Sequence, residues 1–391
     1  MPTTMRFLGP VVCVLAVGAC LAPLGARAVA GQRGTSTNGD DADGLFRTEL
    51  TLSSRQISVA YDPALRADDS VQAVLLAASS VSTEAGVLVA RIEGHRALRI
   101  GPLGPEPEPE EAPSSGVDHD LWLTRLKDGW VLDARPVEQE NATVPAESSR
   151  IPLRHRTTRE AVDTLSAVLE PMGDDTGRMT LRWGVHVWAT DFEFVELPRR
   201  SRPERTSNVG RPSIRTRDSD LNARYRATAL GSRNETALRT TDGAHIQVLF
   251  QREVGTDSDD FPAIESTVDG NVLELTRSAA IRLRTEVPLQ FGDTLVPTGN
   301  LAPNFPGAYA LWLKKNGTDW RLVFNNEPDS WGTQHDPAFD AAELDLAYER
   351  VDGVDSDRPL AVYFVPLGAA ENRLILHWGE HVWTAGFAVA Q

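Results

Sequence analysis

Two histidines and a glutamate near the carboxyl end of the chain carry the most specific chemical pattern in the sequence. His377, Glu380 and His381 follow the order H-x-x-E-H, which is the inverted signature of zinc proteases. That chemistry needs a helix, because residues four apart then share one face. The segment instead alternates like a strand, where residues four apart stand ~13 Å from each other. One zinc ion, with ligand bonds of ~2 Å, cannot join them. We therefore predict no metal site and no cofactor.

His381 has a counterpart in His186, and both lie in the local sequence G-x-H-V-W. A histidine at a strand turn that bonds to backbone, or that packs beside Trp188 or Trp383, explains both positions. The functional alternative is a ligand-binding or acid–base histidine. We keep His381 as a candidate ligand-binding residue.

Asparagine, tryptophan and histidine gather between residues 325 and 336. Asn and Gly favour turns, so a structural loop explains most of this group. A tryptophan with amides nearby is also a stacking platform with polar edges, which suits a sugar or another small ligand. The candidate ligand-binding residues are therefore Trp331, Asn325, Asn326, His335, Asp336 and His381. We assign no catalytic residue, since the sequence has no G-x-S-x-G elbow, P-loop or dinucleotide fingerprint.

The segments that would position these residues indicate an internal duplication. Residues 178–194 and 373–389 are identical at 8 of 17 positions, including two tryptophans, a glycine and a histidine. Upstream, the sequence LWL occurs at 121–123 and again at 311–313. Short runs that alternate apolar and polar residues predict strands, and a short helix is possible at 338–344. We expect an all-β fold of two tandem antiparallel β-sandwich or barrel-like domains.

The predicted domains are 45–197, a degenerate copy, and 241–391. Residues 198–240 form a linker, and 11 arginines and no lysine lie within 196–240. The linker is interpreted as flexible, with contact to an anionic surface as the alternative. Residues 1–30 predict an export signal that ends in A-V-A, and 31–44 a disordered segment. V-G-A-C at 17–20 also resembles a lipobox, which makes Cys20 a candidate for lipidation.

The net charge of −16 argues against a nucleic-acid partner, because such binding depends on neutralising phosphates with basic residues. Both cysteines lie within the first 20 residues, so a chain cleaved after the signal has no disulfide and no thiol nucleophile. Membrane contact is expected only through the signal or a lipid anchor.

The second copy resembles the bacterial "domain of unknown function 2911" family. The motifs that carry the resemblance are G-x-Y-x-L at 307–311, a Trp-to-Asn strand at 320–325 and a Trp-Gly turn at 331–332. Residues 273–277 lack the Trp, Gly and Asn of the family's preceding stretch, and the first copy departs further. The resemblance implies secretion and a β-rich fold, and it implies no reaction.

Two functional hypotheses follow. The first is an exported protein of the periplasm or cell surface, without enzymatic activity, that binds a small ligand or an envelope protein through its second copy. The second is an envelope enzyme, hydrolase-like, that uses His381 with Asp336 or His335. The sequence favours the first, because it contains no recognisable catalytic group of residues.

Overall fold

The computed structural model describes residues 44–67, 86–104, 116–137, 149–197, 233–298 and 307–390, apart from 277, 279, 329 and 369. Within these ranges the predicted all-β class is confirmed, since the strands pair antiparallel and the one α-helix is the single turn α3 (Ala263–Ser266). The predicted export signal, Cys20, residues 31–43 and most of the arginine-rich linker, 198–232, lie outside the described residues.

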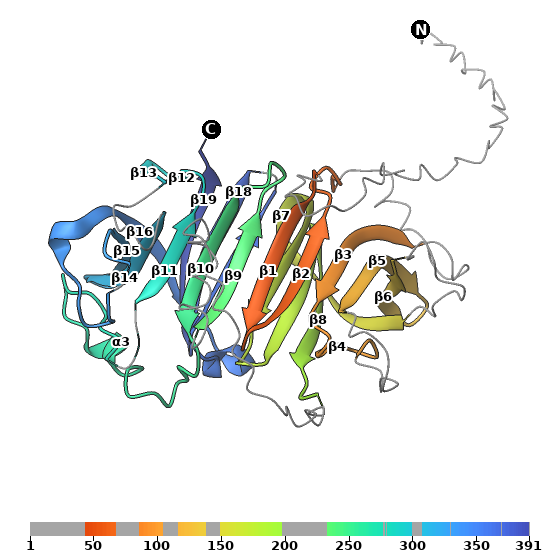
Figure 1. Ribbon diagram of the computed structural model, residues 1–391, viewed down its shortest axis with the longest axis horizontal. Coiled ribbons are helices and arrows are strands. Elements are labelled where there is room, and N and C mark those ends of the chain that lie inside the picture. Colours follow the sequence, from red (N-terminus) through yellow and green to blue (C-terminus); the bar gives the residue numbers. More distant parts are fainter. Residues whose placement is uncertain are drawn as a thin grey trace, which may run out of the picture. The chain divides into compact units, whose positions relative to one another are not determined.

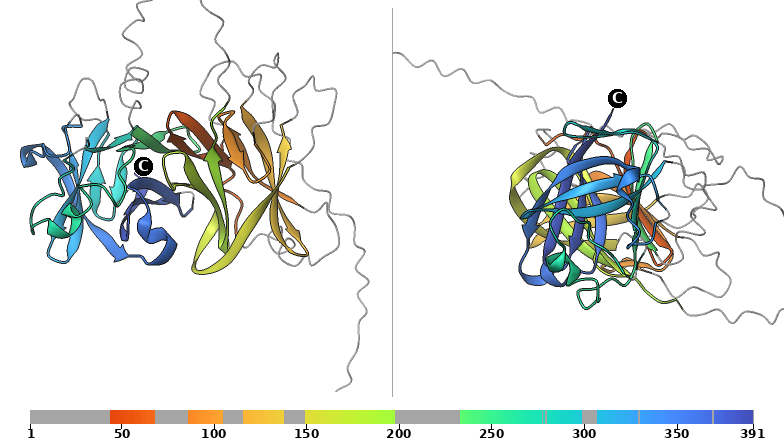
Figure 2. Two further views of the ribbon diagram at one scale, coloured as in Figure 1. Left: turned by 90° about the horizontal axis from the view of Figure 1, so that it is seen from below. Right: turned by 90° about the vertical axis from the view of Figure 1, so that its left-hand side faces the viewer.

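The first half contains eight strands, whose pairing order is β1-β2-β3-β5-β6-β7-β8-β4. They are β1 (Phe46–Leu52), β2 (Arg55–Tyr61), β3 (Val87–Gly94), β4 (Leu98–Ile100), β5 (Val117–Leu126), β6 (Gly129–Pro136), β7 (Ser149–Pro171) and β8 (Thr176–Phe194). The long β7 pairs first with β6 and then with β8, so it carries the chain from one layer to the other. β1 and β2 consequently pack against β7, as two facing layers (Figure 2).

The second half repeats this order with more, shorter strands. They are β9 (Arg233–Arg239), β10 (His245–Gln251), β11 (Ile281–Thr285), β12 (Leu289–Phe291), β13 (Thr294–Val296), β14 (Ala308–Asn316), β15 (Asp319–Asn325), β16 (Asp340–Arg350), β17 (Ala361–Pro366), β18 (Glu371–Trp378) and β19 (His381–Val389). The order β9-β10-β11-β14-β15-β16-β19 is followed by β18 and β17, and β19 also pairs with β12.

The two halves share one sheet, because β1 pairs directly with β9 (Figure 1). The register centres on Glu49 opposite Ala237. Arg233–Arg239, which we predicted to be the end of the linker, is therefore a central strand bonded on both sides. The predicted linker boundary at residue 240 is therefore wrong. The sequence RNETALR has no apolar alternation that would have predicted a strand, and its extended conformation comes from pairing with β1 and β10.

The second layer joins the halves through reciprocal ion pairs. Arg373 of the second half donates to Glu160 of the first, with 3.1 Å between Nη1 and Oε2. Arg178, which occupies the place of Arg373 in the repeated sequence, lies 3.8 Å from Asp355 of the second half. The described residues of both halves, from 44 to 390, accordingly belong to one compact unit. The internal duplication itself stays a prediction.

A glycine in the left-handed region turns the chain at matching points of both halves. Gly379 (φ +57°) lies between β18 and β19, and Gly184 (φ +61°) lies within β8. β8 folds back on itself there, since the backbone N–H of Phe194 donates to the carbonyl of Asp175, 2.8 Å away. The repeated histidine, His186 or His381, follows the turning glycine by two residues. Each turn therefore places its histidine at the start of the strand that runs back.

Five of the nine tryptophans are among the largest fully buried side chains of the core: Trp183, Trp188, Trp320, Trp378 and Trp383. All five lie in the strands that match between the halves, and they fill the space between the layers.

Candidate functional site

Asn325 organises the loop that carries most of the predicted site residues. Its side chain is 1% exposed, and its amide nitrogen donates to the carbonyl of Asp336 and to the carboxylate of Asp340, each 2.8 Å away. Its amide oxygen accepts from the backbone N–H of Glu327 at 2.9 Å. A buried amide with three short bonds is satisfied, so Asn325 is a structural residue of this loop.

His335 and the two remaining polar candidates complete the same hydrogen-bonded loop. His335 Nε2 lies 2.9 Å from Asp340, and its ring packs against Trp312 with 5.2 Å between centroids. The Asp336 carboxylate accepts from the N–H of Ala338 at 2.9 Å. Asn326 donates its backbone N–H to Phe339 at 2.9 Å. The structure therefore brings together Asn325, Asn326, His335 and Asp336.

A helix is absent from residues 338–344, where the sequence allowed one. Pro337–Phe339 forms a single 3-10 turn, and β16 begins at Asp340. Pairing with β15 extends the backbone from that point, and Leu344 and Leu346 then face the core on alternate positions.

Trp331 stands out because its side chain is 48% exposed while its backbone neighbours are fixed. The carbonyl of Ser330 accepts from Ala280, and Gly332 exchanges two 2.8 Å bonds with Leu275 and Ser278. A Cβ at Gly332 would overlap the backbone oxygens of Leu275 and Ser278, so glycine is required. The Trp-Gly turn thus holds the indole outward on a rigid strip of chain.

His381 lies away from this loop. It pairs with Arg350 at the far end of β16, while Asp340 begins that strand. Ten residues of strand span roughly 33 Å, so His381 does not converge with His335 or Asp336. Its ring is 1% exposed and hydrogen-bonds through Nδ1 to the Tyr348 hydroxyl at 2.8 Å. Burial lowers the pKa of His381, and the charge of Arg350 adds to this effect.

His381 belongs to an aromatic stack that both halves contain. In the second half, Tyr348 and His381 lie nearly parallel to Trp383, at 5.8 and 5.7 Å between centroids. Lys315 Nζ lies 4.4 Å from the centroid of Trp320, which packs edge-on against Trp383. The edge of Phe261 covers His381 at 5.6 Å. Trp320, His381 and Trp383 of this stack are buried, whereas Phe261, Lys315 and Tyr348 are partly exposed.

In the first half the corresponding stack contains two histidines. His155 Nε2 lies 3.0 Å from His186 Nδ1, and both rings lie nearly parallel to Trp188 at 5.4 and 5.6 Å. The guanidinium of Arg125 lies 5.5 Å from the Trp130 centroid, as Lys315 does over Trp320. His155 is exposed and His186 partly exposed. Desolvation lowers the pKa of both imidazoles, with Arg125 contributing to each.

His155 was not among the residues singled out from the sequence. It lies opposite Trp188 in the ladder of β7 and β8, as Tyr348 lies opposite Trp383 in that of β16 and β19. Aligning these strands through their tryptophan partners would have identified the position. The sequence alone indicates this position weakly, because a histidine in the first half corresponds to a tyrosine in the second. Its partner His186 also lies 31 residues further along the chain.

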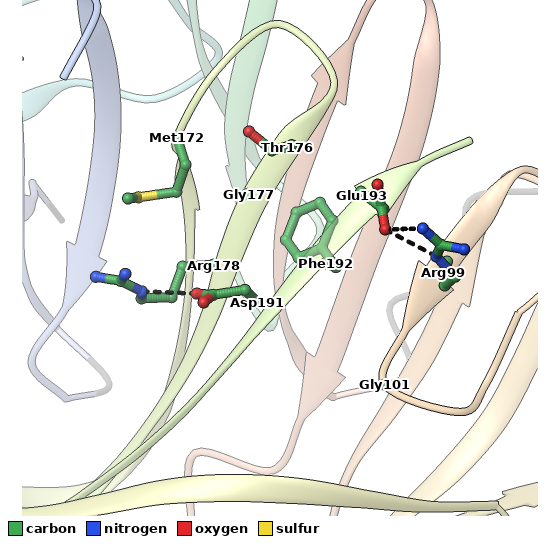
Figure 3. A pocket seen from close by; sticks show the side chains of 9 residues that line it. All are labelled: Arg99, Gly101, Met172, Thr176, Gly177, Arg178, Asp191, Phe192 and Glu193. Atoms are coloured by element: carbon green, nitrogen blue, oxygen red, sulfur yellow. Dashed lines mark hydrogen bonds and ion pairs between the residues drawn. The ribbon is translucent and has the colours of Figure 1, made fainter. Parts of the chain in front are cut away.

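A groove of about 460 Å³ opens beside the β8 hairpin (Figure 3). Two of its arginines pair with two of its carboxylates: Arg99 Nε with Glu193 at 2.8 Å, and Arg178 Nε with Asp191 at 2.9 Å. Hydrogen bonds from Arg154 and Arg178 hold the pKa of Asp191 below its usual value. Because these charges already bind each other, the groove offers no convergent polar group for a ligand.

Within the described ranges no cluster of three or more potential metal ligands occurs. None of the helices found there has the length and apolar character needed to cross a membrane. Comparison with known families, curated proteins and solved structures gave no match. The resemblance to the "domain of unknown function 2911" family stays a prediction.

Proposed function

We propose that this chain is an exported protein of the cell envelope that acts without catalysis and binds a saccharide against Trp331. The observation that carries the proposal is the fixed, half-exposed indole. Leaving about 100 Å² of an aromatic side chain in water forgoes roughly 2–3 kcal/mol of burial. In a loop with a structural role alone, we expect this side chain to point inward or a polar residue to stand at this position.

The surroundings of Trp331 favour a sugar ring as the ligand class. The flat face of an indole packs against the C–H face of a pyranose, and polar groups at its edge bind the hydroxyls. The side-chain oxygen of Gln334 accepts from the backbone N–H of Trp331 at 3.1 Å, which holds the Gln334 amide next to the Trp331 backbone. The exposed Asp336 carboxylate and Phe339, which is 44% exposed, belong to the same loop.

Export is supported by the predicted signal at 1–30 and by the small-x-small site before residue 31. The enzyme alternative needs His381 within reach of a substrate held at His335 or Asp336. The length of β16 between them does not favour it.

Isothermal titration with soluble muropeptides and neutral oligosaccharides tests the proposal. The wild-type chain is expected to bind at least one of these probes, and Trp331→Ala to weaken that binding at least about tenfold, or 1.4 kcal/mol. Leu295→Ala is the matched control, because Leu295 is an exposed apolar residue (52%) on β13, outside the loop. Equal binding by Trp331→Ala, or no binding by any saccharide, would overturn the proposal.

A further inference from the structure

We propose that His155 and His186 form a binding site for a late first-row divalent cation, with Cu²⁺ the best fit, on the surface of the first half. This site is separate from the Trp331 loop and does not depend on its function. The starting observation is the 3.0 Å separation between His155 Nε2 and His186 Nδ1.

That separation suits two ligands of one metal ion. With metal–nitrogen bonds of about 2.0–2.1 Å, two nitrogens at an angle of about 90–110° lie roughly 2.8–3.4 Å apart. The backbone therefore needs no movement. A rotation of the exposed His155 ring directs both lone pairs to a common point, and each ring then keeps its proton on the nitrogen that faces away.

The two imidazole ligands favour metal ions that bind nitrogen. The described residues place no third histidine, cysteine or carboxylate in a group with this pair. Hard cations such as Mg²⁺ and Ca²⁺ require oxygen ligands, whereas Cu²⁺, Ni²⁺ and Zn²⁺ accept imidazole, with Cu²⁺ bound most tightly. Water fills the remaining positions, which the exposure of His155 permits.

Two features of the stack act in opposite directions on affinity. Trp188 stacks on both rings and limits their motion, so beyond the rotation of His155 little ring freedom is lost on binding. The charge of Arg125 repels a cation, although desolvation, to which Arg125 adds, lowers the pKa of both imidazoles and favours the neutral form that binds metal. Because His155 is exposed, solvent screens the repulsion.

The second half supplies an internal comparison. There Tyr348 occupies the place of His155, and the hydrogen bond to His381 is kept at 2.8 Å. Phe261 also covers the ring. The same framework therefore accepts tyrosine without losing its stack, which makes His155→Tyr a substitution that removes one ligand and preserves the fold.

The test is a titration of the untagged full-length chain with CuSO₄, followed by calorimetry and by electron paramagnetic resonance. One equivalent is expected to bind, with a spectrum that shows two nitrogen ligands. His155→Tyr should weaken this binding at least about tenfold, while circular dichroism and the melting temperature show that it folds. His95→Asn is the control, since Asn can replace the bond that His95 Nδ1 accepts from Ala97.

Several results would overturn the site: no binding by the wild type beyond the buffer background, a signal without two nitrogen ligands, or full binding by folded His155→Tyr. If His155→Tyr fails to fold, His155→Gln and the nitrogen count of the wild-type spectrum decide the question. Trp331→Ala should bind copper like the wild type, so failure here and failure of the saccharide proposal are distinguishable.

Discussion

Single histidines in this protein differ in state because their surroundings differ. His377 is 4% exposed, and its Nε2 lies 3.1 Å from the carbonyl of Asp355 and 3.0 Å from that of Gly379. Two carbonyl acceptors require a proton on Nε2, but the buried ring resists a second one. Burial, followed by the charge of Arg358, lowers the pKa of His377 to about 4.

This shift predicts a loss of stability in acid. Between the unfolded pKa of 6.5 and the folded value of about 4, only the unfolded chain takes up the proton, so stability falls as the pH falls. The titration of His377 should lower the free energy of unfolding by roughly 2 kcal/mol between pH ~7.5 and pH ~5. Urea unfolding at both pH values measures it. His377→Gln keeps an N–H donor without titrating, so it should lose less than the wild type. An equal loss in both would exclude His377 as the cause.

At the scale of elements, the turn between β18 and β19 depends on one glycine for two reasons. Gly379 has a positive φ, and a Cβ there would lie 2.5 Å from Cζ of Phe261, the residue that covers His381. Gly292, in the turn between β12 and β13, has a similar φ of +53° but no atom within 4 Å of a built Cβ.

Alanine at these two glycines separates backbone strain from packing. The free energy of unfolding of both variants should fall by about 1–2 kcal/mol, because alanine is strained in the left-handed conformation. Gly379→Ala should lose roughly 1–3 kcal/mol more, because Phe261 must move. Denaturant unfolding of the two variants gives the difference. If it is zero, Phe261 yields without cost and does not hold the turn.

Short alternating runs in the sequence were sufficient to predict the all-β class, and the places where the pattern misleads have physical causes. Ala161, Leu165 and Val168 have the spacing of a helix face, yet they lie in the strand β7, because the chain pairs there with β8. β9 was missed because neighbours on both sides, rather than an apolar pattern, determine its state.

The candidate site was predictable only where its members are close in sequence. Asn325, Asn326, His335 and Asp336 come together within one loop, as local turn preferences suggest. His381 was grouped with them although β16 separates them. His155 was overlooked because its partner, His186, is reached through ladder pairing, which a single sequence does not reveal.

For the whole molecule, the pairing of β1 with β9 predicts that both halves unfold together. Ala237 lies opposite Glu49 on one side and Gln247 on the other. Ala237→Pro removes a donor from a central strand and should cost ~3 kcal/mol or more. Hydrogen exchange by mass spectrometry should show β5–β6 and β14–β15 losing protection together.

Leu295→Pro, on β13, is the control. Its loss of protection should remain local, since β13 pairs with β12 only among the described strands. Unchanged protection of β5–β6 in Ala237→Pro would contradict this coupling.

The shared sheet also has a consequence for the time course of synthesis. β1 ends at Leu52, but its partner β9 begins at Arg233. At 5–20 residues per second, roughly 10–40 s pass before the ribosome has added that partner. During this interval the nascent first half carries an unpaired strand edge, and the edges of two nascent chains can pair with each other. Crowded polysomes should therefore favour misassembly of this protein, and a holding chaperone should suppress it.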